Sequence, residues 1–165
     1  MKLTNVLALL SIIVFSSIAG ASGEHAGGHG STDAIGRAGN PDNVTSTITI
    51  DMSDAMRFTP STITVKQGET IRFIVSNSGK IPHEMVLGME KELEEHYEAM
   101  KKHPEMEHSD DNMVVVQPGK TGEIIWQFTK AGTVSFACLL PGHYEAGMKG
   151  AVEVKAGTRK NRDTK

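Results

Sequence analysis

The sequence has few of the features that would indicate a disulfide-rich, nucleic-acid-binding or membrane protein. It contains one cysteine among 165 residues, so no disulfide bond can form within the chain. Its 17 Lys and Arg against 20 Asp and Glu give a formal net charge of −3, without the basic excess of a nucleic-acid-binding protein. Beyond residue 21 no apolar run approaches the roughly 20 residues that cross a bilayer. We therefore expect about one folded domain that binds no nucleic acid and, once mature, lies outside the membrane.

The first 21 residues have the pattern of a secretory signal peptide. Lys2 supplies the positive charge, residues 7–19 form the apolar stretch, and Ala19-Gly20-Ala21 fits a cleavage site for small residues. The sequence therefore predicts an exported protein. We assign it to the periplasm, although these features do not separate the periplasm from the external medium.

The rest of the chain divides by composition. Residues 22–43 are rich in Gly, Ser and Asn and have almost no large apolar side chains, which predicts a disordered tail. Residues 44–156 contain seven or eight short segments rich in β-branched and aromatic residues, separated by turn signals and without a βαβ rhythm. This pattern predicts an all-β domain, an antiparallel sandwich or barrel. Residues 157–165 form a basic C-terminal tail.

One insertion, residues 88–112, interrupts the β pattern. Its residues 89–103 are strong helix formers and end before Pro104. A stripe at helical spacing places certain residues on one face: Met89, Leu93, His96, Met100 and His103. The stripe can pack the helix on the sandwich, or its imidazole and thioether groups can bind copper.

The single cysteine lies in a pattern typical of metal ligands. Cys138, His143 and Met148 follow one another at five-residue intervals, and His83 opens the apolar stretch PHEMVLG far upstream. Two His, one Cys and a weak axial Met form the mononuclear copper site of electron-transfer proteins. Cys138 could instead be a small buried side chain. A catalytic Cys–His pair would need an orienting Asn or Asp and an electropositive setting, and neither is visible.

Residues 60–87 and 131–154, which contain PSTITVKQGETIRFIVSNSGKIPHEMVL and AGTVSFACLLPGHYEAGMKGAVEV, resemble the two signature halves of the cupredoxins, the plastocyanin–azurin superfamily. The resemblance covers residues 44–156. It implies a Greek-key β-sandwich with copper at one end, held by His83, Cys138, His143 and Met148. It also implies an apolar, electron-exchanging surface around the second His, where a redox or copper-transfer protein docks. The residues expected there are Leu139, Leu140, Pro141 and Gly142.

Two departures from plastocyanins stand out. Plastocyanins have Asn after the first His, where this chain has Glu84. The two spacings of four residues in the ligand loop resemble the type 1 site of multicopper oxidases. Those enzymes flank the Cys with His ligands of a trinuclear cluster, whereas this chain has Ala137 and Leu139. We therefore expect a protein that is not an enzyme.

Further His and Met residues bear on the role of the copper. The chain has nine Met and seven His, including His25 and His29 in the tail, so additional, weaker copper could bind there or at His96, Met100 and His103. These features resemble small exported cupredoxins of bacterial copper-tolerance systems. We predict a monomeric protein of copper tolerance that sequesters copper or oxidises Cu(I). The alternative is a soluble electron shuttle. An interaction module without metal is disfavoured because all four ligands are present.

Overall fold

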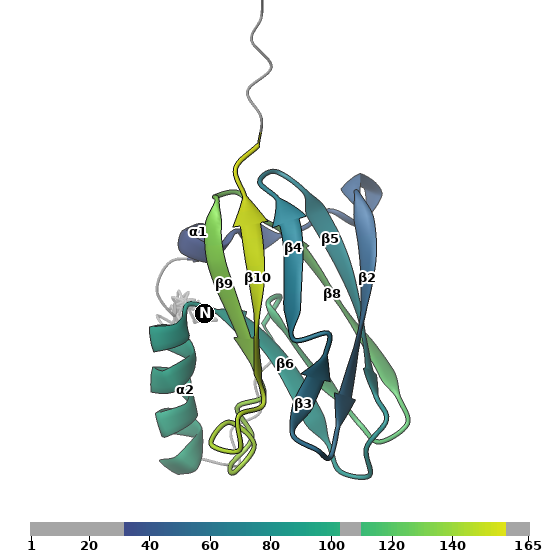
Figure 1. The fold of residues 1–165 in the computed structure, drawn as a ribbon, viewed down its shortest axis with the longest axis vertical. Helices are drawn as coiled ribbons and strands as arrows, with labels where there is room; N and C mark the ends of the chain where they lie inside the picture. Colours follow the sequence, from purple (N-terminus) through teal and green to yellow (C-terminus); the bar gives the residue numbers. More distant parts are fainter. Residues whose placement is uncertain (1–31, 103–109, 158–165) are drawn as a thin grey trace, which may run out of the picture.

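Two five-stranded sheets form the body of the protein in the computed structural model, which describes residues 32–102 and 110–157 (Figure 1). The first sheet has the order β1 (Arg37–Ala38), β8 (Thr121–Gln127), β5 (Thr70–Asn77), β2 (Ser46–Ser53) and β3 (Arg57–Thr59). The second has the order β4 (Thr62–Lys66), β10 (Lys149–Lys155), β9 (Gly132–Ala137), β6 (His83–Gly88) and β7 (Met113–Val116). The helical segments are α1 (Thr32–Ile35), η1 (Pro41–Asn43) and α2 (Glu90–Lys102). The all-β sandwich with a helical insertion is confirmed.

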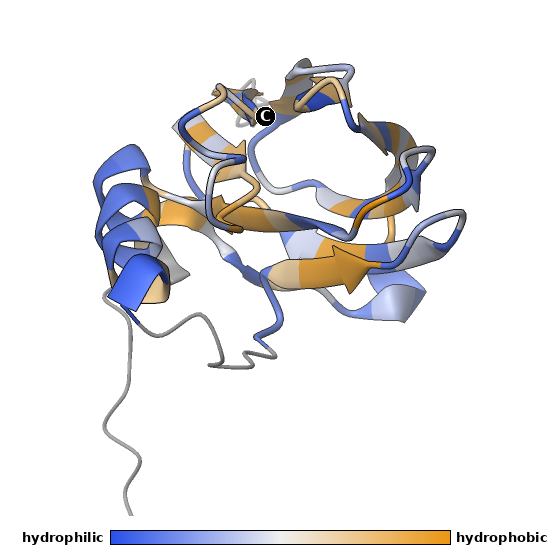
Figure 2. Cartoon of the chain, turned by 90° about the horizontal axis from the view of Figure 1, so that it is seen from below, coloured by the Kyte–Doolittle hydropathy of each residue, from blue (hydrophilic) through white to orange (hydrophobic). Residues whose placement is uncertain are grey.

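Apolar and polar residues alternate along the strands, and the apolar side chains form one buried core cluster. Figure 2 shows hydrophobic residues recurring along the strands. Ile63 and Val65 of β4 are buried between exposed neighbours, and Phe73 and Val75 of β5 are fully buried. Each large side chain buried in this way stabilises the fold by about 1.5–3 kcal/mol. The core therefore fixes the strand ends that carry the polar site described below.

The sheets are mixed, which corrects the prediction of an antiparallel sandwich. Strands β2 and β5 pair in parallel, as do β4 and β10, while the other pairs are antiparallel. Between β2 and β5 the chain passes through β3 and then crosses to the other sheet at β4. That excursion lets β5 return beside β2 in the same direction. The alternation of apolar and polar residues along one strand does not indicate whether that strand pairs with its neighbour in parallel or antiparallel.

The segment before Val44 contradicts the prediction of disorder where the structure describes it. Ile35 is only 4% exposed, and its carbonyl accepts a hydrogen bond of 3.0 Å from Nε1 of the buried Trp126. Strand β1 pairs with the edge of β8, where Nε of Arg37 donates to Oε1 of Gln127 at 2.8 Å. One buried isoleucine and an available strand edge order residues 32–43 despite their polar composition. Residues 22–31 of the predicted tail lie outside the described residues.

Helix α2 covers the outer side of β6 and β9, next to the loop between β9 and β10 (Figure 1). Its buried side chains are Leu93, Tyr97 and Met100, which modifies the predicted stripe. Met89 is 39% exposed, and Tyr97 takes the inward position that the stripe gave to His96, which is half-buried. His103 lies outside the described residues. The helix packs through Leu93 and Tyr97 against a cluster that comprises Val86, Ala137, Leu139 and Tyr144.

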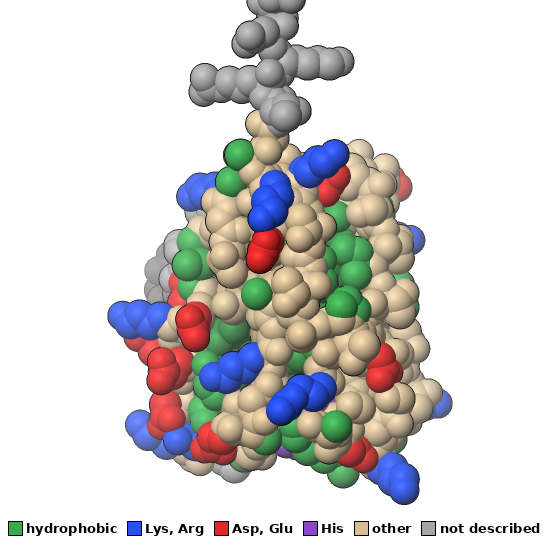
Figure 3. All heavy atoms as spheres, viewed as in Figure 1, with side chains coloured by type: hydrophobic (Ala, Val, Ile, Leu, Met, Phe, Trp, Pro, Cys, Tyr) green, Lys and Arg blue, Asp and Glu red, His purple; other side chains and the backbone are tan. Residues whose placement is uncertain are grey.

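The outer side of α2 is acidic. Carboxylates gather over this helix in Figure 3, and its sequence contributes Glu90, Glu92, Glu94, Glu95 and Glu98. Lys91 and Glu95 form an exposed pair at 3.5 Å, of the kind that adds only a few tenths of a kcal/mol. Within the described part of the chain, no helix is both long and apolar enough to span a membrane.

The anchoring of the N-terminal segment predicts a stability effect. Ile35→Ala should lower the free energy of unfolding of the metal-free protein by about 2 kcal/mol, near the low end for a buried Ile, because a site near the end of the fold can partly collapse. Denaturant unfolding followed by tryptophan fluorescence measures the change. Val115→Ala, at a side chain 46% exposed, is the control and should change stability by less than about 0.5 kcal/mol. Equal effects of the two changes would show that Ile35 does not anchor this segment.

Candidate metal centre

Two neighbouring strands bring the predicted ligands together. Strands β6 and β9 are antiparallel, with Val86 opposite Ala137, so the beginning of β6 and the end of β9 lie at the same end of the sheet. His83 is the first residue of β6, and Cys138 directly follows β9. His143 comes from the loop that leads from Cys138 to β10. The register therefore places residues 55 positions apart in the sequence beside each other.

Three donor atoms converge at this point. Nδ1 of His83 lies 3.2 Å from Nδ1 of His143, and Sγ of Cys138 lies 3.3 Å from the same Nδ1 of His143. All three donors lie within 4.8 Å of one another, and no other such group of His, Cys, Asp or Glu occurs among the residues that the structure describes. Metal bonds of about 2.0–2.3 Å separate the ligands of one ion by about 3–4 Å. The spacing therefore fits a single metal ion.

Burial keeps the Cys138 thiol and the His143 imidazole uncharged in the metal-free protein. His83 and Cys138 are fully buried, whereas His143 is half-buried. Burial raises the pKa of the Cys138 thiol to about 12. The pKa of His143 is lowered, first by burial and then by the neighbouring His83. A metal ion that binds here would meet a His143 imidazole already free of the extra proton and would displace the proton of the Cys138 thiol.

Backbone hydrogen bonds fold the ligand loop back on itself. The His143 amide donates to the Leu140 carbonyl at 3.0 Å, and the Met148 amide donates to the His143 carbonyl at 3.1 Å. The Cys138 amide in turn donates to the Met148 carbonyl at 3.1 Å, so the backbone of Met148 lies beside that of Cys138. The Met148 side chain is fully buried in the same apolar cluster as Cys138. Its role as the axial ligand stays a prediction.

Glu84 holds the ligand loop in place of the Asn that is usual in plastocyanins. Its side chain is buried, and Oε1 accepts a hydrogen bond of 2.8 Å from the Leu139 amide. Its own amide points at Sγ of Cys138 at 3.5 Å. Burial raises the pKa of the Glu84 carboxyl, partly opposed by the Leu139 hydrogen bond. Because Glu84 follows His83 and Leu139 follows Cys138, this hydrogen bond joins the backbone next to one predicted ligand to the backbone next to the other.

Asp54 is a polar contact of the site that sequence reasoning missed. It lies in the turn between β2 and β3, and its Oδ1 is 3.1 Å from Nε2 of His83. Its Oδ2 accepts the Lys80 amide at 2.8 Å, and this hydrogen bond is the main reason why the pKa of Asp54 is lowered. In the sequence, Asp54 is one turn residue among several, 29 positions from its partner, and no local signal distinguishes it.

Helix α2 also contacts the ligand loop. The rings of Tyr97 and Tyr144 stack with centroids 4.9 Å apart, and Tyr144 directly follows His143. The Tyr97 hydroxyl oxygen accepts a hydrogen bond of 3.5 Å from the Gly142 amide, and the Lys149 ammonium lies 3.5 Å from the centroid of the Tyr144 ring. The insertion therefore supports the loop that supplies His143, the half-buried donor.

The remaining predicted site residues lie elsewhere. Met100 and His96 are on α2, buried and half-buried, and His96 belongs to no converging group of three or more His, Cys, Asp or Glu donors among the described residues. His25, His29 and His103 lie outside the described residues. Leu139, predicted for the surface beside the second His, is fully buried against α2, whereas Pro141 and Gly142 are exposed.

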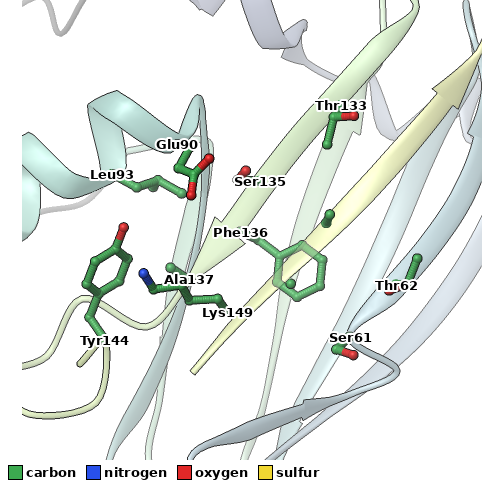
Figure 4. A pocket seen from close by; sticks show the side chains of 12 residues that line it. Ser61, Thr62, Glu90, Leu93, Thr133, Ser135, Phe136, Ala137, Tyr144 and Lys149 are labelled. Atoms are coloured by element: carbon green, nitrogen blue, oxygen red, sulfur yellow. The ribbon is translucent and has the colours of Figure 1, made fainter. Parts of the chain in front are cut away.

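A pocket of about 440 Å³ lies between α2 and strands β9 and β10 (Figure 4). Its lining combines Glu90 and Lys149 with Phe136 and Tyr144, and includes none of the converging donors. The candidate metal centre is therefore a closed cluster of side chains and not a part of this pocket.

Comparison with known proteins agrees with this geometry. Residues 44–155 match the family model described as "Copper binding proteins, plastocyanin/azurin family". The chain is 50% identical to the "Copper-resistant cuproprotein CopI" of Rubrivivax gelatinosus, over 79% of this chain and 81% of that one. It is 34% identical to the protein of the same name from Pseudomonas aeruginosa, over 88% and 94% of the two chains.

Solved structures show the same fold. A dithionite-reduced auracyanin from Roseiflexus castenholzii has a TM-score of 0.58 at 24% identity, covering 67% of this chain and 98% of that one. Auracyanin B has a TM-score of 0.60 at 19% identity, covering 74% and 95%. At these identities the likeness concerns the fold alone.

The buried thiol predicts proton release on copper binding. At pH 8 the thiol of Cys138 is protonated and His143 is neutral, so binding of Cu(II) as a thiolate complex should release about one proton. Copper affinity should accordingly rise about tenfold per pH unit near pH 8. Calorimetric titrations in buffers of different ionisation enthalpy count the proton. Cys138→Ser, whose hydroxyl keeps its proton, is the control, and a wild-type protein that releases none would contradict this account of the site.

Proposed function

Since the chain belongs to the plastocyanin/azurin family of copper-binding proteins, we propose that it is an exported type 1 copper protein of copper tolerance. Its ligands are His83, Cys138, His143 and Met148. The observation that carries the proposal is the convergence of two Nδ1 atoms and one buried thiol within 4.8 Å. This donor set is the one that a mononuclear cupredoxin site requires.

Each proposed ligand has a distinct task. Bound copper supplies a one-electron Cu(I)/Cu(II) couple. The thiolate of Cys138 is the strong soft donor, and the two neutral imidazoles suit both oxidation states. Met148 is the weak axial donor that tunes the site more than it holds it. Because the sandwich and Glu84 fix these groups before metal binds, little rearrangement accompanies a change of oxidation state.

Two features support a role in copper tolerance. The relatives from Rubrivivax gelatinosus and Pseudomonas aeruginosa align with most of this chain, and both are named copper-resistant cuproproteins. The chain also carries His and Met beyond the main site, and for these additional copper binding is a prediction: His25, His29, His96, Met100 and His103. In this proposal the signal peptide directs the protein to the periplasm, where it sequesters copper or handles Cu(I) without being an enzyme.

A soluble electron shuttle is the second candidate. It is compatible with the exposed residues that precede two of the proposed ligands: Pro141 and Gly142 before His143, and Pro82 and Ile81, which is 39% exposed, before His83. A redox or copper-transfer protein could dock there, next to the half-buried imidazole. The same surface serves copper transfer in the tolerance proposal, so it does not separate the two functions.

Variants of the sulfur ligands test the main site. Cys138→Ala should abolish the intense visible absorption of the Cu(II) protein, because thiolate-to-copper charge transfer requires the sulfur. Met148→Leu should keep both copper and colour and raise the reduction potential, because the axial bond is long and weak. Absorption spectra measure the charge-transfer band in both variants, and voltammetry measures the reduction potential of Met148→Leu. A wild-type Cu(II) protein with only a faint ligand-field spectrum, or loss of copper in Met148→Leu, would contradict the assignments.

A deletion strain separates the two functions. If the protein confers tolerance, its loss should lower the copper concentration that permits growth while leaving respiratory growth in low copper unchanged. Wild-type protein should restore growth in copper, and a Cys138→Ala protein made at the same level should not. Impaired respiration without copper sensitivity would overturn the tolerance proposal and favour the shuttle.

A further inference from the structure

We infer that Asp54 is a positioning residue of the copper site, whose carboxylate holds His83 through Nε2 and thereby presents Nδ1 to the metal. The inference rests on the proposed role of His83 as a ligand. It adds to that proposal a residue from a third segment of the chain, the turn between β2 and β3.

The contact determines which nitrogen of His83 carries the proton. Oδ1 of Asp54 lies 3.1 Å from Nε2 of a fully buried ring, while Nδ1 of the same ring faces Nδ1 of His143 at 3.2 Å. A carboxylate only accepts hydrogen bonds, so a neutral His83 donates its single proton from Nε2. The lone pair of Nδ1 is then left for a metal ion. Ligating His side chains are oriented in this way by carboxylates in other metal sites.

The loop between β5 and β6 holds Asp54 in turn. Oδ2 of Asp54 accepts the Lys80 amide at 2.8 Å, and a Cβ atom at Gly79 would collide with Oδ1. Asn77 shapes this loop, because its side chain accepts the Gly79 amide at 2.8 Å and donates to the carbonyls of Ile81 and Val116 at 2.8 and 2.9 Å. The carboxylate therefore occupies a place that the loop leaves open for it.

A second set of contacts joins the turn to the same loop. The Ser78 amide donates to the Met52 carbonyl at 2.9 Å, and its hydroxyl donates to Oδ2 of Asp51 at 2.7 Å. Met56 closes the turn with a φ of 57°, and its amide donates to the Ser53 carbonyl at 3.0 Å. A non-glycine residue at positive φ needs support from its surroundings. The turn that carries Asp54 is thus fixed on both sides of this residue.

The negative charge of Asp54 should also affect the copper couple. An anionic acceptor makes the imidazole of His83 a stronger donor, which favours Cu(II) over Cu(I). Removal of a group that orients a ligand typically weakens metal affinity 10- to 100-fold. If that loss falls on Cu(II) alone, the reduction potential rises by about 60–120 mV, since a tenfold change corresponds to 59 mV for one electron.

The experiment compares wild type with Asp54→Ala, Asp54→Asn and Asp51→Asn. Asp51→Asn removes a neighbouring charge that does not contact His83, while the amide group of Asn can still hydrogen-bond the hydroxyls of Ser76 and Ser78, so this variant controls for charge alone. Asp54→Ala should weaken Cu(II) binding 10- to 100-fold and raise the potential. Asp54→Asn, whose amide oxygen can still accept from Nε2, should recover most of the affinity. Asp51→Asn should resemble wild type in both measurements.

A readout on the metal-free protein keeps the two proposals distinguishable. Nitrogen-15 NMR of wild-type apoprotein should show the His83 proton on Nε2, and Asp54→Ala should contain both tautomers. A wild-type proton on Nδ1 would overturn the inference whether or not the variants fold. Normal copper binding by wild type, with unchanged affinity and potential in Asp54→Ala, would overturn it as well and leave the ligand assignment intact. A wild type without the copper–thiolate band would instead refute the proposed function.

Discussion

The site depends on the pairing of β6 with β9. This register puts the first residue of one strand, His83, beside the residue that follows the other, Cys138, at a depth where neither side chain contacts solvent. Burial of charged groups would be costly, but burial itself raises the pKa of the Cys138 thiol and lowers that of His143, so both are neutral without metal. The sandwich can therefore form around the donors first. Folding has then already ordered the donor side chains, so a metal ion that binds between them causes little further loss of conformational entropy.

Two carboxyl groups hold this pair of strands at the site, and their surroundings give them different electrostatic roles. Glu84 is buried, which disfavours its charged form, and it acts through a hydrogen bond to the Leu139 amide. Asp54 is part-exposed and accepts backbone amides, which favour its charged form. Glu84 thus braces the loop that carries Cys138, while Asp54 places a negative charge behind His83. Both effects act on the part of the site that strands β6 and β9 position, and His143 completes it from a loop.

The predictable part of the molecule is the part encoded locally. Strand alternation indicated the sandwich, helix formers indicated α2, and the short spacing of Cys138, His143 and Met148 indicated one ligand loop. The parallel pairs, the packing of Ile35 on Trp126 and the contact of Asp54 with His83 all join distant segments. Composition and periodicity describe one segment at a time. They contain no information on which distant strand edge or turn a residue will meet.

Helix α2 contacts the loop around His143 through the side chain of Tyr97. Tyr97 stacks on Tyr144, the residue after His143, and its hydroxyl accepts the amide of Gly142, the residue before it. Gly142 has a φ of 87°, a backbone conformation that residues other than glycine adopt at a cost. The hydrogen bond from its amide to Tyr97 stabilises this conformation of the turn. The helix therefore restricts the backbone on both sides of His143. The half-buried His143 is therefore held in part by an element outside the two sheets.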